Sequence, residues 1–248
     1  MSEIVLVVPC YNEGNRLPVD KFVAYADSHA HISFVFVNDG SADHTGAVLE
    51  DLVRRDATAF TLLTLERNTG KGEAVRHGMR HALERSPDLV GYWDADLATP
   101  LAEVDAMATH FGDDPKLQLL LGSRVLMMGR EIERRAVRHY SGRVFATVVS
   151  LMLRLPVYDT QCGAKLFRAN DVTRELFGDP FLTRWIFDVE IIARLKRIVD
   201  PTSTAEMAKA MREHPLTEWH DVPGGNLRLR DFFRATLDLR RIYRHYLP

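Results

Sequence analysis

The sequence predicts an α/β protein with a doubly wound, mostly parallel sheet flanked by helices. Five apolar runs in the first half of the chain have the length of strands and lack strict apolar–polar alternation, which is typical of strands covered on both faces. Helix-like segments separate these runs, and strands that alternate with helices build parallel sheets. With 248 residues, 46% of them hydrophobic and 27% charged, the chain is long enough for one large domain of this kind.

The expected strands follow one another at intervals that leave room for a helix after each. They are residues 4–9 (IVLVVP), 32–40 (ISFVFVNDG), 60–66 (FTLLTLE), 89–96 (LVGYWDAD) and 117–124 (LQLLLGSR). The helices expected among them cover about 16–30, 43–56, 71–85 and 101–111.

The second half of the chain has a different pattern. Residues 143–157 predict an amphipathic or buried helix, residues 159–168 a polar loop that leads into a strand, and residues 184–197 a further helix. The tail, 226–248, interleaves arginines with Leu, Phe, Ile and Tyr, and it could pack on the sheet or lie on a membrane surface.

Composition and charge exclude several classes of protein. The formal net charge is −2, so no global basic field indicates a nucleic-acid partner. Two distant cysteines, Cys10 and Cys162, make no disulfide framework and fit a reducing compartment. The N-terminus has no basic start of a signal peptide, and the longest apolar stretch, Val144 to Leu153, is too short to span a bilayer. We therefore expect a cytoplasmic protein.

Polar residues follow the end of every expected strand in the first half. Ligands of open α/β sheets bind beyond the carboxyl ends of the strands. A single polar cluster there is usually a turn or a helix cap, whereas five along one edge favour a binding site. The five clusters are Pro9 to Glu13, Asn38 to Ser41, Arg67 to Gly72, Asp94 to Asp96, and Gly122 to Arg124.

The fourth cluster carries the strongest chemical signal. Asp94 and Asp96 are one residue apart at a strand end, and alternate side chains of an extended chain point the same way. Two carboxylates that lose water together need a cation, and Mg²⁺ or Mn²⁺ prefers carboxylate oxygens. The alternative to a metal site is a helix cap from Asp96 or Thr99 ahead of Pro100.

The third cluster, NTGKGEAVRHG (68–78), matches neither of two familiar phosphate-binding loops. A P-loop needs Ser or Thr after its Lys, but Gly72 follows Lys71, and a dinucleotide fingerprint needs Gly where Val75 stands. The glycines still let a ligand approach the backbone, and Lys71 supplies a cation at a helix start, unless the segment is a plain turn. Asp39, in the second cluster, could accept hydrogen bonds from a base or ribose.

Together these stretches resemble family 2 glycosyltransferases with the GT-A fold. Within that family the chain looks most like the polyprenyl-phosphate group, which includes dolichyl-phosphate glucosyltransferases and dolichyl-phosphate mannose synthases. The matching stretches run from residue 5 to about 192 and are VVPCYNEGNRLP, FVNDGSADHT, RNTGKGEAVRHGM, YWDADLATP, GSR, DTQCGAKLFR and RWIFDVEII. The last two stretches are specific to a smaller part of the family than the rest, and they favour the dolichyl-phosphate glucosyltransferases over the mannose synthases.

The resemblance implies a role for each matching residue. It implies that Pro9, Tyr11, Asn12, Glu13 and Asp39 bind the nucleotide, with Lys71 near it. Asp94 would lie by the sugar and ribose, and Asp96 would bind the metal on the diphosphate. The acceptor phosphate or the diphosphate would face Arg124 and Arg138, and the side of the sugar and acceptor would be lined by Asp159, Gln161 and Lys165.

The resemblance also implies one GT-A domain over residues 1–248. Residues 1–125 would bind the nucleotide sugar, 126–225 the acceptor, and 226–248 would form a basic amphipathic segment. Two departures stand out: Leu97 follows the D-x-D where relatives often have glycine, and PGGNL (223–227) stands where relatives tend to have a Ser-Lys pair, which could move a cationic clamp to Arg228.

The expected reaction is metal-dependent transfer of a hexose with inversion, most simply from UDP-glucose to a polyprenyl or dolichyl phosphate. A peripheral position on the cytoplasmic membrane face would bring the enzyme to such an acceptor. An ionised phosphate needs no general base, whereas a hydroxyl acceptor does, and Asp159 is then the candidate. The alternatives are a soluble or saccharide acceptor, GDP-mannose as donor, and a nucleotide-sugar-binding protein without turnover. The sequence leaves the oligomeric state open.

Overall fold

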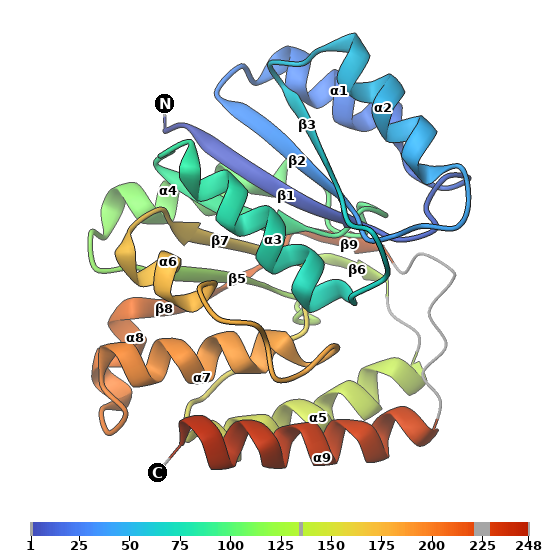
Figure 1. Cartoon of the computed structure of the whole chain (residues 1–248). Helices are drawn as coiled ribbons and strands as arrows, with labels where there is room; N and C mark the ends of the chain where they lie inside the picture. Colours follow the sequence, from blue (N-terminus) through green and yellow to red (C-terminus); the bar gives the residue numbers. More distant parts are fainter. Residues whose placement is uncertain (1, 134–135, 221–228, 248) are drawn as a thin grey trace.

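A seven-stranded sheet forms the centre of the protein (Figure 1). The computed structural model describes residues 2–133, 136–220 and 229–247. The sheet has the order β3-β2-β1-β4-β7-β5-β8, and only β7 runs against its neighbours, β4 and β5, among the described strands. Its strands are β1 (Ile4–Cys10), β2 (Ile32–Asn38), β3 (Phe60–Thr64), β4 (Leu89–Trp93), β5 (Leu119–Ser123), β7 (Ala164–Arg168) and β8 (Met211–Pro215). The predicted mostly parallel α/β sheet is confirmed.

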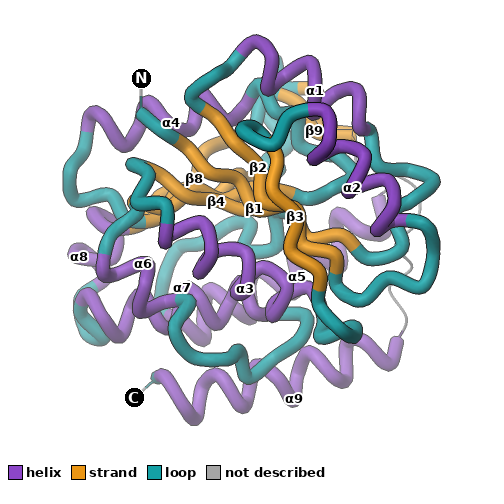
Figure 2. Tube along the Cα trace, turned by 45° about the horizontal axis from the view of Figure 1, so that its top comes forward, coloured by secondary structure: helices purple, strands orange, loops and turns teal. Residues whose placement is uncertain are grey.

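Helices cover both faces of the sheet, which lies as an inner layer in Figure 2. One face packs on α1 (Val19–Ser28), α2 (Thr45–Arg55) and α4 (Glu103–Asp113). On the other side, the sheet shares one core with α3 (Lys71–Glu84), α5 (Ala136–Leu153), α6 (Asp171–Leu176), α7 (Phe187–Val199) and α9 (Leu229–Tyr246), and α9 packs against α7. A short helix, α8 (Thr204–Ala210), leads into β8.

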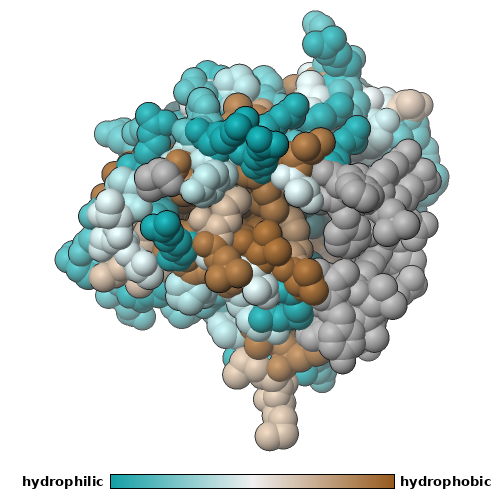
Figure 3. All heavy atoms as spheres, turned by 90° about the horizontal axis from the view of Figure 1, so that it is seen from below, coloured by the Kyte–Doolittle hydropathy of each residue, from teal (hydrophilic) through white to brown (hydrophobic). Residues whose placement is uncertain are grey.

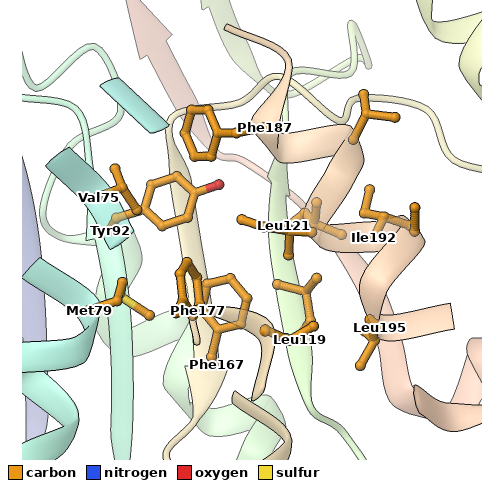
Figure 4. Packing of buried hydrophobic residues seen from close by; sticks show 14 of the residues in the cluster. Val75, Met79, Tyr92, Leu119, Leu121, Phe167, Phe177, Phe187, Ile192 and Leu195 are labelled. Carbon is orange, nitrogen blue, oxygen red and sulfur yellow. The ribbon is translucent and has the colours of Figure 1, made fainter. Parts of the chain in front are cut away.

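Alternate residues of each central strand enter different cores, because successive side chains point to opposite faces. In β1, Leu6 packs in the cluster under α1 and α2, while Val5 and Val7 pack under α3. On the α3 side, Tyr92 of β4 lies among Val75, Phe167 and Phe187 (Figure 4). Burial on both faces explains why the strands read as continuous apolar runs.

The second half of the chain holds most of the differences from the predicted elements. The helix expected over 143–157 begins at Ala136 and ends at Leu153, and Arg154 follows it in the left-handed region with φ 54°. The two-stranded parallel sheet of β6 (Glu131–Glu133) and β9 (Glu218–His220) was not predicted, nor were β8, α6 and α8. These elements are short or polar, so they carry little periodic signal.

Both halves of the proposed domain division contribute strands to the central sheet, since β7 and β8 come from the second half. The division itself stays a prediction. None of the helices in the described ranges combines the length and the apolar composition that crossing a bilayer requires.

Candidate functional site

Most of the predicted site residues lie in the loops at one edge of the sheet. The parallel strands β1, β2, β4 and β5 end there, and β7 begins there because it runs in the opposite direction. The sheet therefore orders the candidate site from the β1–β3 side, through Asp94 and Asp96 after β4, to the loop before β7 and Arg124 after β5. Hydrogen bonds and ion pairs across neighbouring loops hold this edge together.

The D-x-D segment turns sharply away from β4. The amide of Asp94 donates to the Gly163 carbonyl at 3.0 Å, and the amide of Ala98 donates to Asp96 Oδ1 at 3.1 Å. Leu97 takes a positive φ of 50°, a conformation that glycine adopts without steric cost. The bond from Ala98 makes Asp96 part of a local turn, as the helix-cap interpretation supposed. It uses only Oδ1, so Oδ2 of Asp96 can bind another partner.

A lysine supplies a cation to these carboxylates. Lys71, at the start of α3, forms an ion pair with Asp94 Oδ1, which otherwise has no hydrogen-bond partner among the described residues. Burial lowers the pKa of Lys71, but the carboxylates of Asp94, Asp188 and Asp96 outweigh it and leave that pKa raised. Lys71 was expected near the nucleotide, and the structure places its ammonium on Asp94.

The environment of Asp96 favours a further cation. Burial and the charge of Asp94 raise the pKa of Asp96, although Lys71 partly offsets them. No group of three or more metal-ligating His, Cys, Asp or Glu side chains occurs in the ranges that the structure describes. Two carboxylates fit Mg²⁺ or Mn²⁺, which commonly bind through one or two carboxylates together with substrate phosphates. The residues present thus suit an ion that arrives with a diphosphate.

Gly163 lets the Asp94 carboxylate occupy its position. A Cβ at residue 163 would lie 1.9 Å from Asp94 Oδ2, far inside van der Waals contact. We expect Gly163→Ala to displace Asp94 and to lower transfer activity by about 10²-fold, because a misplacement of about 1 Å can have that effect. Steady-state assays of both proteins measure the loss.

The matched control for this substitution is Gly112→Ala in α4, where a Cβ meets nothing within 4 Å. That variant should keep full activity. Equal activity of the Gly163 and Gly112 variants would contradict the steric role of Gly163.

On the β1–β3 side, Asp39 has partners within the protein. Its carboxylate accepts from Thr69 N at 2.7 Å, from Thr69 Oγ1 at 2.8 Å and from Gly70 N at 2.9 Å. Asp39 is only 2% exposed, so it holds the loop before α3. Its expected contact with a base or ribose would have to be made in addition to these bonds.

The residues after β1 form the neighbouring wall. Pro9 is half-buried and Tyr11 is exposed, so both can reach a ligand. Asn12 has φ 55°, and its Oδ1 accepts from Ala42 N at 2.9 Å. Glu13 is buried and forms an ion pair with Arg16. Its carboxylate is therefore directed to Arg16 and not to a ligand.

On the β5 side, Arg124 and Asp159 form a two-pronged pair. Arg124 Nε lies 2.6 Å from Asp159 Oδ2, and Arg124 Nη2 lies 2.8 Å from Oδ1. The same carboxylate accepts from the amides of Arg124 at 3.1 Å and Gln161 at 3.2 Å. This geometry disfavours Asp159 as a general base, because both of its oxygens already accept hydrogen bonds. Arg138 lies in α5, but its side chain is outside the described residues, as are PGGNL and Arg228.

Lys165 does not line the site, contrary to expectation. Its side chain is fully buried, and Nζ donates to Asp188 Oδ1 and to the Cys162 carbonyl, both at 2.6 Å. Asp188 and Gly163 were not among the predicted site residues. Both stand in quoted motifs, but their contacts join distant parts of the chain and leave no local signal.

The sheet order and the helices on both of its faces form the GT-A fold, which solved glycosyltransferase structures share. A glucosyl-3-phosphoglycerate synthase structure from Mycobacterium tuberculosis, in complex with phosphoglyceric acid, matches with a TM-score of 0.68 at 17% identity over 100% of this chain and 81% of that one. The chain belongs to glycosyl transferase family 2, whose profile matches residues 5–174.

Within this family, the chain is similar to dolichyl-phosphate beta-glucosyltransferases over most of its length. A dolichyl-phosphate beta-glucosyltransferase of Drosophila melanogaster is 30% identical over 91% of this chain and 69% of its own length. Those of Trichomonas vaginalis and Saccharomyces cerevisiae are both 28% identical, over 96% and 98% of this chain and 72% and 74% of their own lengths. The predicted family and enzyme class are confirmed.

Proposed function

We propose that the protein transfers glucose from UDP-glucose to a polyprenyl or dolichyl phosphate, with inversion and with Mg²⁺ or Mn²⁺. The observation that carries this proposal is the placement of the Arg124–Asp159 pair across the β7 loop from Asp94 and Asp96. An anionic donor and an anionic acceptor would then meet between a carboxylate pair and a guanidinium. The relatives named as dolichyl-phosphate glucosyltransferases support the acceptor.

The residues of the chain suit displacement by a phosphate. Asp94 and Asp96 would hold the divalent ion, which offsets the charge that grows on the leaving diphosphate. An acceptor phosphate oxygen would bond to the anomeric carbon from the opposite face, while the bond from that carbon to the diphosphate oxygen breaks and its electrons leave with the nucleoside diphosphate. Nε and one Nη2 hydrogen of Arg124 bind Asp159, so Arg124 would draw the acceptor phosphate in with Nη1 and the second Nη2 hydrogen, which form another pair of parallel donors. No proton has to be removed.

A solved neighbour supports the donor and the ion. The Mycobacterium tuberculosis synthase was also solved with Mn²⁺, UDP-glucose and phosphoglyceric acid, with a TM-score of 0.66 to this chain. The structure of a Pyrobaculum calidifontis mannosyltransferase contains GDP-mannose and Mn²⁺, and it keeps GDP-mannose as the alternative donor.

A matrix of donors and acceptors tests the proposal. UDP-glucose and GDP-mannose are each incubated with Mn²⁺, Mg²⁺ or EDTA, and with a polyprenyl phosphate, 3-phosphoglycerate or a free sugar. We expect a metal-dependent glucolipid from UDP-glucose and polyprenyl phosphate. Transfer to 3-phosphoglycerate or to a free sugar, without lipid product, would instead establish a soluble acceptor.

A peripheral membrane position would bring the enzyme to this acceptor. The face of α5 and α9, seen in Figure 3, has a patch of hydrophobic side chains. Val144, Val148 and Leu151 are exposed on one stripe of α5, at 68%, 48% and 74%. Exposed arginines of α9 complement an anionic lipid surface, and they are Arg234, Arg240, Arg241 and Arg244.

We expect the double substitution Val148→Asp and Leu151→Asp to lower binding to anionic vesicles by about 100-fold or more, because it removes two apolar contacts of roughly 1.5–3 kcal/mol each and adds negative charge. Flotation with vesicles of phosphatidylserine and phosphatidylcholine measures this, and added salt should weaken the binding of the wild type. Thr109→Asp, on α4, adds the same kind of charge on the opposite layer and should bind normally. Unchanged flotation of the α5 variant would remove the stripe from the membrane contact.

A further inference from the structure

A buried carboxylate under the site connects several elements of its floor. Asp188, in the first turn of α7, is 5% exposed. It accepts from the Tyr92 hydroxyl of β4 and, at 2.6 Å, from Lys165 Nζ of β7, while Gln161 Nε2 lies 3.5 Å away. Lys165 in turn donates to the Cys162 carbonyl. One carboxylate therefore joins β4, β7, the loop before β7 and α7.

Stability alone is a poor explanation for this cluster. A buried ion pair repays the loss of hydration only with good geometry, and well-packed apolar residues often stabilise a core at least as well. Here a fully buried Lys165 and a buried Asp188 interrupt the apolar cluster that holds Tyr92, Phe167 and Phe187. Burial and the charge of Asp188 raise the pKa of Tyr92, so the phenol stays protonated and donates. We therefore attribute to this cluster the role of fixing β4, β7 and the loop before β7 relative to one another.

The positions that it fixes meet at Asp94. Lys165 lies opposite Tyr92 in the antiparallel register of β4 and β7. Two residues after Tyr92, Asp94 donates through its amide to the Gly163 carbonyl, and its carboxylate occupies the space that a Cβ at residue 163 would take. Asp188 thus holds both sides of the contact between the D-x-D segment and the loop Gln161–Gly163.

This loop occupies the middle of the sheet edge. The candidate nucleotide residues follow β1 and β2, the diphosphate carboxylates follow β4, and Arg124 follows β5. The loop before β7 lies between the last two, where the transferred sugar must be, since the sugar links the diphosphate to the acceptor. Gln161 and Gly163 are partly exposed there.

We propose that Asp188 is a positioning residue that fixes the sugar-facing wall, Gln161–Gly163, against Asp94. The inference rests on the proposed function, because it assumes a nucleotide-sugar donor at this edge. It deepens that function by separating two parts of donor binding: Asp188 governs the sugar and leaves the nucleotide largely unaffected.

The test compares the binding of UDP and UDP-glucose, each with MnCl₂, by isothermal titration calorimetry. For Asp188→Asn we expect the affinity for UDP to stay within about twofold and the affinity for UDP-glucose to fall by about 10–100-fold, as for residues that orient metal ligands in other proteins. An equal change for both ligands, or no change for either, would overturn the proposal. No acceptor is needed, so an error in the acceptor does not affect the result.

Two further variants separate positioning from loss of structure. Asp188→Asn/Lys165→Met removes the stranded charge and should regain thermal stability without regaining the affinity for the sugar; recovery of both would leave Asp188 a structural role only. Glu190→Gln breaks another buried pair of α7, with Arg194 at 2.8 Å, and should keep the wild-type difference between the two ligands. If the wild type binds neither ligand, the proposed donor is wrong, and the same comparison is made with GDP and GDP-mannose.

Discussion

Asp96→Asn is expected to lower transfer activity by about 10³-fold, because a bound divalent ion contributes several kcal/mol to charge stabilisation and each 1.36 kcal/mol is a factor of ten. Asparagine keeps the Oδ1 acceptor that Ala98 uses, so the local turn should survive. Excess chelator should lower the wild-type rate to a similar level and change the variant little. Full wild-type activity in chelator would exclude the metal.

The same substitution should raise the thermal stability of the ligand-free protein at neutral pH. The pKa of Asp96 is raised above its usual 3.8 by burial and by Asp94. A carboxyl group with a raised pKa in the folded state stabilises below its unfolded pKa, and that contribution is lost as pH rises through the folded pKa. At neutral pH the ionised Asp96 therefore lowers the free energy of unfolding, and the neutral side chain of asparagine does not. Addition of Mn²⁺ and UDP should reverse the order, because only the wild type gains from binding.

Asp51→Asn is the matched control for these measurements. Asp51 is an exposed aspartate of α2, paired with Arg54 and remote from the sheet edge. Its substitution should change neither the rate, nor the response to chelator, nor the effect of Mn²⁺ on melting.

The sequence predicted the half of the fold in which continuous apolar runs alternate with helical segments. The runs beginning at Ile4, Ile32, Phe60, Leu89 and Leu117 contain β1 to β5, because residues on both faces of these strands are buried. Asp94 and Asp96 were recognisable for the same reason: two charges at the end of a buried run are conspicuous.

What the sequence could not provide is the choice of partner for each charge. The insertion of β7 between β4 and β5 places Lys165 in the core, although its segment looks like a polar loop. Asp39 turns to the loop of Thr69, and Asp159 turns to Arg124, 35 residues away in the chain. These pairings arise from strand order and helix packing, which no local pattern encodes.

The second large effect concerns Arg124 and Asp159, and it distinguishes a phosphate acceptor from a hydroxyl acceptor. With a phosphate acceptor we expect Arg124→Lys to lower the rate by about 10²-fold, since lysine cannot reproduce two parallel donors. Asp159→Asn should also lower the rate, because it loosens the guanidinium that the carboxylate orients through bonds of 2.6 and 2.8 Å. The double variant should then lose little more than the worse single variant, as residues that act as one unit are not additive.

With a hydroxyl acceptor the pattern differs in both size and pH dependence. Asp159→Asn would remove a general base at a cost of roughly 10²–10⁴-fold, and Arg124→Lys would be the milder change. The wild-type rate would also fall as Asp159 becomes protonated, and the asparagine variant would lose that dependence. For the phosphate reaction, Asp159→Asn should leave the shape of the pH profile unchanged.

Rates at saturating UDP-glucose decide between a phosphate and a hydroxyl acceptor. They are measured over a range of pH for the wild type, both single variants and the double variant. Arg212→Lys and Asp114→Asn, in an ion pair at the opposite end of β5 and β8, provide the matched control and should leave the rate unchanged. A dominant, pH-dependent loss in Asp159→Asn alone would establish a base and a hydroxyl acceptor. Because Asp159 uses both oxygens to hold Arg124, we expect the coupled, pH-independent pattern of a phosphate acceptor.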